Sequence, residues 1–220
     1  FMLYCMKRKL ENIREVFTMN KVITISREYG AGGHSIGTKV AEALGIPFYD
    51  RDIVRATVEE SGFEKKLIEK EEEDRSTGDD IWKKISSISS SYFNDSQDAI
   101  HEIQKAIIIK MAQKGPCVIL GRCADVILKE AEIDTLNVFI HADELHRGVR
   151  VTELTGTKNA TEIQKMLSKR DRARHNYYNH YSNGRKWGDS HNYDMTLDSG
   201  KLGYDLCVKL IVEAASEAEE

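Results

Sequence analysis

Short runs of β-branched and aliphatic residues recur along the chain, and helical spacings of apolar residues separate most of them. Strands are predicted at residues 22–25, 47–50, 116–120, 136–140 and 194–197. Helices are predicted after the first strand as far as Gly45, and at residues 100–113, 143–154, 160–178 and 201–215. Apolar strands that alternate with helices indicate a three-layer α/β fold, in which a parallel sheet carries helices on both faces.

The pattern changes at two places. Residues 1–20 precede the first strand and are expected to form an N-terminal helical extension, which places the main domain at residues 21–216. Residues 51–95 are first highly charged and then serine-rich. Their acidic stretch at residues 69–74 is typical of a solvated helix face, or of an insert that moves over a site. A chain of 220 residues is expected to form one domain with such an insert.

Composition narrows the classes of partner. The formal net charge of −4 provides no general basic field, so neither nucleic acid nor an anionic membrane is expected to bind. No apolar stretch approaches the roughly 20 residues that a membrane-spanning helix needs. The apolar start is interrupted at residues 7–9, so no signal peptide is expected. The four cysteines have no metal-ligand spacing, which is typical of reduced thiols in a cytoplasmic protein.

A glycine loop at residues 29–33 (Y-G-A-G-G) lies between the first strand and the following helix. A loop in this place directs backbone N–H groups and the positive end of the helix dipole at one point, and such a point binds phosphate. The Ser35 hydroxyl, in the first turn of the helix, is placed to hold Mg²⁺. The predicted phosphate ligands are Gly30, Ala31, Gly32, Gly33, His34 and Ser35.

The loop departs from the standard pattern G-x-x-x-x-G-K-[ST], because no lysine stands where that pattern requires one. In one register His34 occupies the lysine position. In a second register, which aligns the G-A-G of residues 30–32, Gly33 occupies it. Arg27 or His34 is expected to supply the missing positive charge. Arg27 is favoured, because a histidine is only partly protonated near neutral pH.

The stretch S-R-E-Y-G-A-G-G-H-S-I-G at residues 26–37 resembles the beginning of the cytidylate kinase-like family. This family is a divergent branch of the nucleoside-monophosphate kinases, and its loop pattern also lacks the lysine. The resemblance continues in the same order through I-L-G-R (119–122), V-F-I-H-A (138–142), K-R-D-R-A-R (169–174) and D-M-T-L-D-S-G-K-L-G (194–203). It spans roughly residues 21–210.

The resemblance implies a P-loop kinase domain with an acceptor-side insert at residues 51–95 and an arginine-bearing lid at residues 143–190. ATP and Mg²⁺ would be the cofactors, and a nucleoside monophosphate, best CMP or dCMP, would be the acceptor. The charge of the transferred group would be neutralised by four arginines: Arg147, Arg150, Arg170 and Arg174. The acceptor would be held by Arg122, Asp171 and Arg174. Asp50 and Arg51, which end the second strand at the same edge of the sheet, are expected to bind the acceptor or a metal.

Several of these residues have an alternative interpretation from the sequence. A cation on a helix is often solvated or part of an ion pair, and Asp50 and Arg51 are also placed to cap a helix. Arg170 and Arg174 lie one helical turn apart and can converge, whereas Arg172 points elsewhere. The five aromatic residues between positions 177 and 193 could stack on a base, but core packing is the favoured interpretation.

Three functions are therefore compatible with the sequence. The first is a kinase that acts on a nucleoside monophosphate or on another small metabolite. The second is a nucleotide-binding regulatory protein that keeps the fold but has little or no turnover, and the absent lysine favours it. The third is an interaction protein that uses the acidic stretch at residues 69–74. The oligomeric state is left open.

Overall fold

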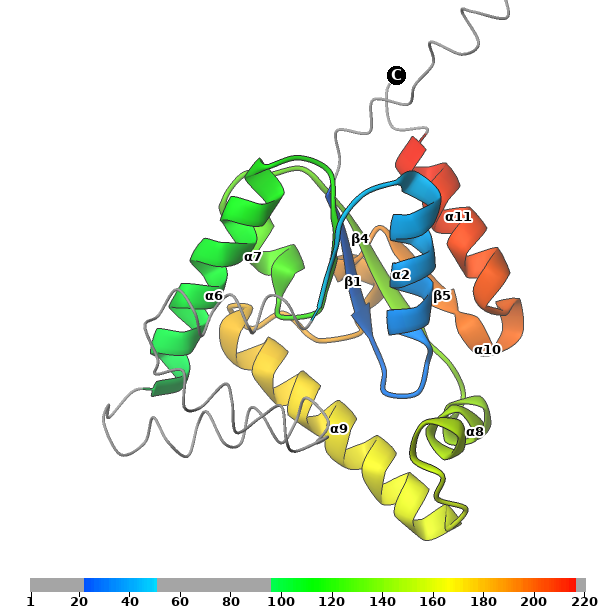
Figure 1. The fold of residues 1–220 in the computed structure, drawn as a ribbon. Coiled ribbons are helices and arrows are strands. Elements are labelled where there is room, and N and C mark those ends of the chain that lie inside the picture. The colour runs from blue at the N-terminus through cyan, green and yellow to red at the C-terminus, as the bar shows by residue number, and fades with distance from the viewer. Residues whose placement is uncertain (1–21, 51–95, 217–220) are drawn as a thin grey trace, which may run out of the picture.

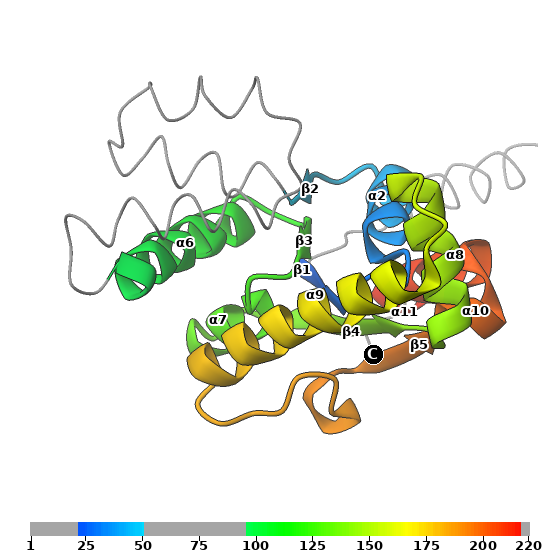
Figure 2. The ribbon, with the colours of Figure 1, turned by 90° about the horizontal axis from the view of Figure 1, so that it is seen from below.

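Five parallel strands form one sheet in the order β2-β3-β1-β4-β5 (Figures 1 and 2). The computed structural model describes residues 22–50 and 96–216, so the predicted N-terminal extension, the predicted insert and Arg51 lie outside the described residues. The five predicted strands are confirmed, and their parallel pairing confirms the α/β class. They are β1 (Val22–Arg27), β2 (Phe48–Tyr49), β3 (Val118–Leu120), β4 (Thr135–His141) and β5 (Met195–Asp198).

Helices cover both faces of the sheet. On one face lie α2 (Gly33–Leu44) and α11 (Tyr204–Ser216), and on the other lie α6 (Ser96–Gln113) and α7 (Ala124–Glu130) (Figure 1). The buried side chains divide in the same way. Residues of α2 and α11 pack with the strands in one cluster, and residues of α6 and α7 pack in another. This is the three-layer arrangement that the sequence predicts.

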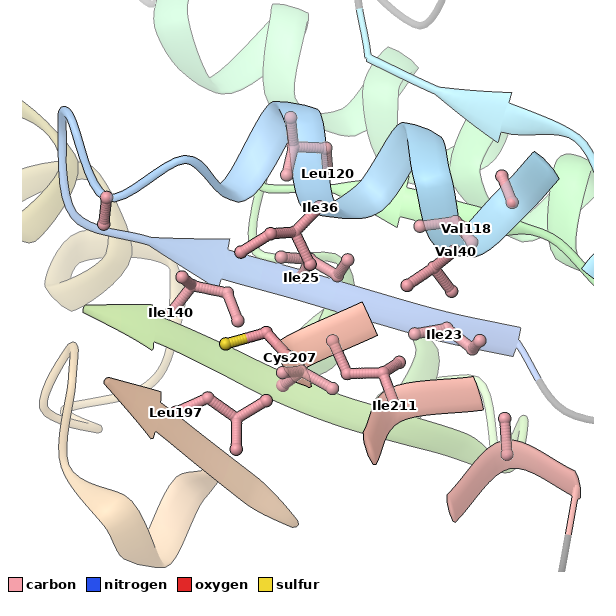
Figure 3. Packing of buried hydrophobic residues seen from close by; sticks show 14 of the residues in the cluster. Ile23, Ile25, Ile36, Val40, Val118, Leu120, Ile140, Leu197, Cys207 and Ile211 are labelled. Atoms are coloured by element: carbon pink, nitrogen blue, oxygen red, sulfur yellow. The ribbon is translucent and has the colours of Figure 1, made fainter. Parts of the chain in front are cut away.

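The larger cluster holds α2 against the sheet (Figure 3). Ile23 and Ile25 of β1 are fully buried on the same face, because successive side chains of a strand alternate. Ile36 and Val40 lie one turn apart on α2 and are also fully buried in this cluster, as is Ile211 of α11. This packing fixes β1 relative to α2, and it therefore fixes the glycine loop that joins them.

The closing helix predicted at residues 201–215 is present as α11, but it begins at Tyr204. The structure has α10 (Ser199–Leu202) and then α11, with Gly203 between them at φ 73°. The positive φ at Gly203 is readily adopted only by glycine, and Asp198 caps the start of α10. No helix is predicted at α7, because residues 124–128 are all buried and no amphipathic spacing marks them.

Two further helices belong to the predicted lid. They are α8 (Glu144–Thr155) and α9 (Ala160–Tyr181), and α9 crosses the carboxyl ends of the strands (Figure 2). Ligands of open α/β sheets bind outside this edge. A short 3₁₀ turn, η1 (Ser190–Asn192), precedes β5. In the described part of the chain, no helix is both long and apolar enough to cross a membrane.

Candidate phosphate-binding site

The glycine loop turns from the end of β1 into the start of α2. Gly30 and Gly32 have φ of 82° and 78°, in the left-handed region that favours glycine, and Gly32 is the N-cap of α2. Within the described residues, no side chain caps this helix start and no acidic residue stands in its first turn. The free N–H groups of a helix start and its positive dipole end suit an anion, as the sequence predicts.

Tyr29, the first residue of the loop, is the point where the loop meets the lid. The guanidinium carbons of Arg170 and Arg174 lie 4.5 and 5.5 Å from the centroid of its ring. The Tyr29 N–H donates to Oδ1 of Asp171 over 2.7 Å, and its carbonyl accepts from Arg147 over 3.4 Å. The predicted convergence of Arg170 and Arg174 is confirmed, and the arginine between them is exposed.

Arg147 is buried between two carboxylates. It pairs with Asp171, and its Nε lies 3.5 Å from Oε2 of Glu28. Its backbone lies against Gly30, where an added Cβ would be 2.7 Å from the Arg147 carbonyl oxygen. Burial raises the pKa of Glu28, and the charge of Arg147 opposes that rise. The sequence predicts that Arg147 neutralises the transferred group and that Asp171 holds the acceptor. In this arrangement both residues join α8 and α9 to the glycine loop.

Arg150 approaches the predicted magnesium ligand. Its Nη2 lies 3.3 Å from Oγ of Ser35, and its Nη1 donates to Glu153 over 2.7 Å. In the described part of the chain, no group of three potential metal-binding side chains is found. A magnesium ion that is held mainly by nucleotide phosphates and water needs only one or two protein ligands. The half-buried Ser35 hydroxyl, whose contact with Arg150 is long, fits such a site.

His34 faces the end of β2. Its Nε2 lies 3.6 Å from Oδ2 of Asp50, and its ring meets that of Phe48 edge to face. Arg27, the other candidate for the missing charge, takes a different path. Its side chain runs from the end of β1 across Gly33 and reaches the residue that follows β3.

Arg122 lies in a strained turn at the carboxyl end of β3. Gly121, Arg122 and Cys123 have φ of 79°, 60° and 55°, so two residues with side chains follow a glycine in the left-handed region. Strain of this kind persists only where the surrounding structure fixes it, and it is common at functional sites. Burial raises the pKa of both Cys123 and Tyr177, and the charge of Arg122 opposes both rises.

The aromatic residues that follow Tyr177 mostly pack within the fold. Tyr178 is buried and donates to Oδ2 of Asp125 over 2.7 Å, and Tyr193 is also buried. The indole of Trp187 donates to Oγ of Ser26 over 3.0 Å. For these residues the favoured interpretation, packing in the core, is confirmed.

Sequence reasoning missed the role of Tyr29 and Glu28 in joining the loop to the lid. The one available signal was a bulky ring directly before the glycines, in a loop where phosphate binding favours small residues. Their partners, Arg147 and Asp171, lie more than a hundred residues away along the chain. Only the folded structure brings these residues together.

Comparisons with known proteins agree with this geometry. A sequence model of the cytidylate kinase-like family matches residues 22–201. A cytidylate kinase of Methanococcus maripaludis is 28% identical over 113 residues, which are 51% of this chain and 62% of the relative. The chain thus spans less than two thirds of that relative's length.

Solved structures agree on the fold. An uncharacterized protein from Eubacterium ventriosum matches with a TM-score of 0.67 and 27% identity, over 90% of this chain and 99% of that one. A shikimate kinase from Bacteroides thetaiotaomicron matches with a TM-score of 0.52 and 13% identity, over 88% and 97%. The second likeness concerns the fold alone. The parallel sheet, its flanking helices and the glycine loop therefore form the three-layer P-loop fold that the sequence predicts.

Proposed function

Because this chain belongs to the cytidylate kinase-like family, we propose that it transfers the terminal phosphoryl group of ATP to a nucleoside monophosphate. CMP or dCMP is the best candidate acceptor, and the similarity to a cytidylate kinase supports that choice. An oxygen of the acceptor's phosphate forms the new bond to the terminal phosphorus of ATP, and the bond from that phosphorus to the bridging oxygen of ADP breaks.

One observation carries the proposal: cations from the lid converge on a phosphate-type loop. Arg150 contacts Ser35 at the start of α2, and Arg170 and Arg174 lie over Tyr29 at the start of the loop. Phosphoryl transfer depends on position and on charge neutralisation more than on covalent help. Arginine suits this role, because its planar guanidinium pairs with two phosphate oxygens and stays charged.

The donor phosphates are assigned to the N–H groups from Gly30 to Ser35. The Ser35 hydroxyl would hold Mg²⁺, which neutralises charge on the donor phosphates when it is bound. The acceptor is assigned to the edge that carries Arg122 and Asp50, at the carboxyl ends of β3 and β2. Arg147 and Asp171 then act by holding the lid against the loop rather than by touching the acceptor.

A second candidate is a nucleotide-binding regulatory protein with little or no turnover. The absence of the loop lysine favours it, since that lysine contacts the β- and γ-phosphates in standard P-loops. A small-metabolite kinase has the same fold and differs in the acceptor pocket. These possibilities predict different results in one assay.

The test is phosphoryl transfer from Mg-ATP to CMP, dCMP, UMP, AMP, GMP and a few small metabolites, with product detected by chromatography. Arg122→Ala is the acceptor-site variant, and Arg172→Ala, an exposed arginine of α9, is the matched control. Transfer to CMP or dCMP that collapses in Arg122→Ala but persists in Arg172→Ala supports the proposal. Transfer only to a non-nucleotide would instead favour a small-metabolite kinase. Magnesium-dependent ATP binding without transfer to any acceptor would favour the regulatory protein.

A further inference from the structure

We propose that Arg27 and Gly33 together replace the missing loop lysine: the arginine supplies the cation from the end of β1, and the glycine makes room for it. The inference rests on the proposed phosphoryl transfer and adds the group that contacts the donor phosphates. In a standard P-loop the lysine extends from the start of the helix. Here the corresponding position, in the register that aligns residues 30–32, is Gly33.

Gly33 has no conformational reason to be glycine. It is absent from the described glycines with positive φ, unlike Gly30 and Gly32 on either side of Ala31. The reason is space, because a Cβ added at Gly33 would lie 2.7 Å from both Cβ and Cγ of Arg27. Real Cβ atoms essentially never approach other atoms so closely, and Cβ and Cγ belong to the stiff base of the arginine. Any side chain at position 33 therefore conflicts with Arg27.

The far end of Arg27 lies against a second glycine, Gly121, whose φ of 79° already favours glycine. A Cβ added at Gly121 would lie 2.3 Å from Nη1 of Arg27. Gly121 follows β3, the neighbour of β1 in the sheet, and it begins the strained turn that carries Arg122. The arginine thus passes from the loop to the acceptor side, between two positions where glycine leaves room for it.

This path places the guanidinium where a phosphoryl group must pass. The donor phosphates are assigned to the start of α2, beside Gly33, and the acceptor to the edge beyond β3, beside Gly121. A guanidinium between these two places can pair with oxygens of the transferred group throughout the reaction. His34 does not fill this role, because it lies beside Asp50 at the end of β2.

The test exchanges the cation between the two positions. Arg27→Gln keeps most of the side-chain volume and removes the charge. It is expected to lower kcat by about 10²-fold, the usual effect of removing one preorganised charge-stabilising donor. Gly33→Lys alone is expected to be inactive, because its Cβ meets Arg27. The double variant Arg27→Gly/Gly33→Lys removes that conflict and restores a cation from the helix side, so it should exceed both Arg27→Gly and Gly33→Lys by at least about tenfold in kcat.

Binding of a fluorescent ATP analogue separates this inference from the proposed function. Weaker binding of the triphosphate in Arg27→Gln, with cytidine or adenosine binding unchanged, supports the cation role even if no acceptor is phosphorylated. If Arg27→Gln transfers phosphoryl groups within about twofold of the wild-type rate, the inference is overturned and the proposed kinase function stands. A folded double variant that is no better than either single variant would also overturn it. Thermal unfolding identifies variants that fail to fold, and Arg27→Gln then decides the question alone.

Discussion

Replacement of Tyr29 by leucine removes the ring on which two lid arginines lie and leaves the backbone contacts of the loop in place. Those contacts, from the Tyr29 N–H to Asp171 and from Arg147 to the Tyr29 carbonyl, do not involve the side chain. The ring meets Arg170 at 4.5 Å and Arg174 at 5.5 Å. The substitution therefore tests whether the position of the arginines, rather than the attachment of the lid, depends on Tyr29.

The expected fall in kcat follows from the loss of the two contacts between the Tyr29 ring and the arginines. A cation–π contact at a partly exposed site contributes about 0.5–1 kcal/mol, so the loss of both amounts to about 1–2 kcal/mol. If that free energy orients arginines toward the transition state, kcat falls about 5–30-fold in Tyr29→Leu. Tyr29→Phe keeps the aromatic face and should stay within about twofold of wild type.

The assay is steady-state phosphoryl transfer with the best acceptor, with kcat and KM measured separately and thermal unfolding recorded for each variant. Arg172→Ala removes one exposed positive charge from α9, so it serves as the control for a change in net charge near the site. Equal losses in Tyr29→Leu and Tyr29→Phe would refute the role of the aromatic face. An unchanged kcat in Tyr29→Leu would refute the positioning of Arg170 and Arg174 by Tyr29.

Three further predictions concern the loop, a buried carboxyl and the core. Gly32→Ala should abolish nucleotide binding, because its Cβ would lie 2.2 Å from a tyrosine ring of α11. Gly156 has a similar φ but open space around it, so Gly156→Ala tests the effect of the backbone conformation alone. Calorimetry should show that Gly156→Ala lowers the free energy of unfolding by about 1–2 kcal/mol. Burial raises the pKa of Asp125, so the folded state holds that proton more tightly and loses the associated stability as pH rises through the raised pKa. The Tm of wild type relative to Asp125→Asn should therefore fall as the pH rises above the ordinary carboxyl pKa of 3.8, and a constant difference would contradict this. Ile211→Ala should lower the free energy of unfolding in urea by about 2–5 kcal/mol, against about 0.5 kcal/mol or less for the exposed Leu206→Ala on the same helix.

The elements of the fold were largely predictable because its strands are short apolar runs that end at glycines or polar residues. The order of the strands was not, since nothing in the periodicity places β3 between β1 and β2. The two missed helix features have local causes. The residues of α7 are buried on all sides and carry no helical period, and Gly203 divides a stretch whose apolar spacing looks continuous.

The site was predictable where one segment defines it, as in the glycine loop and in the shared face of Arg170 and Arg174. It was not predictable where distant segments meet. Nothing local marks Arg147 as buried between Glu28 and Asp171, because that environment exists only after α8 and α9 have packed on the loop.

The missing loop lysine changes which part of the molecule supplies positive charge to the proposed reaction. A lysine on the helix start is present whether or not a lid is closed. In this chain Arg150, Arg170 and Arg174 belong to α8 and α9, whereas Arg27 extends from the end of β1. Most of the positive charge at the site therefore depends on the attachment of α8 and α9 to the loop. Arg27 should accordingly contribute to the first binding of the triphosphate as well as to its transfer, whereas the lid arginines should contribute mainly to transfer. Arg27→Gln should therefore weaken triphosphate binding more than Arg170→Ala does.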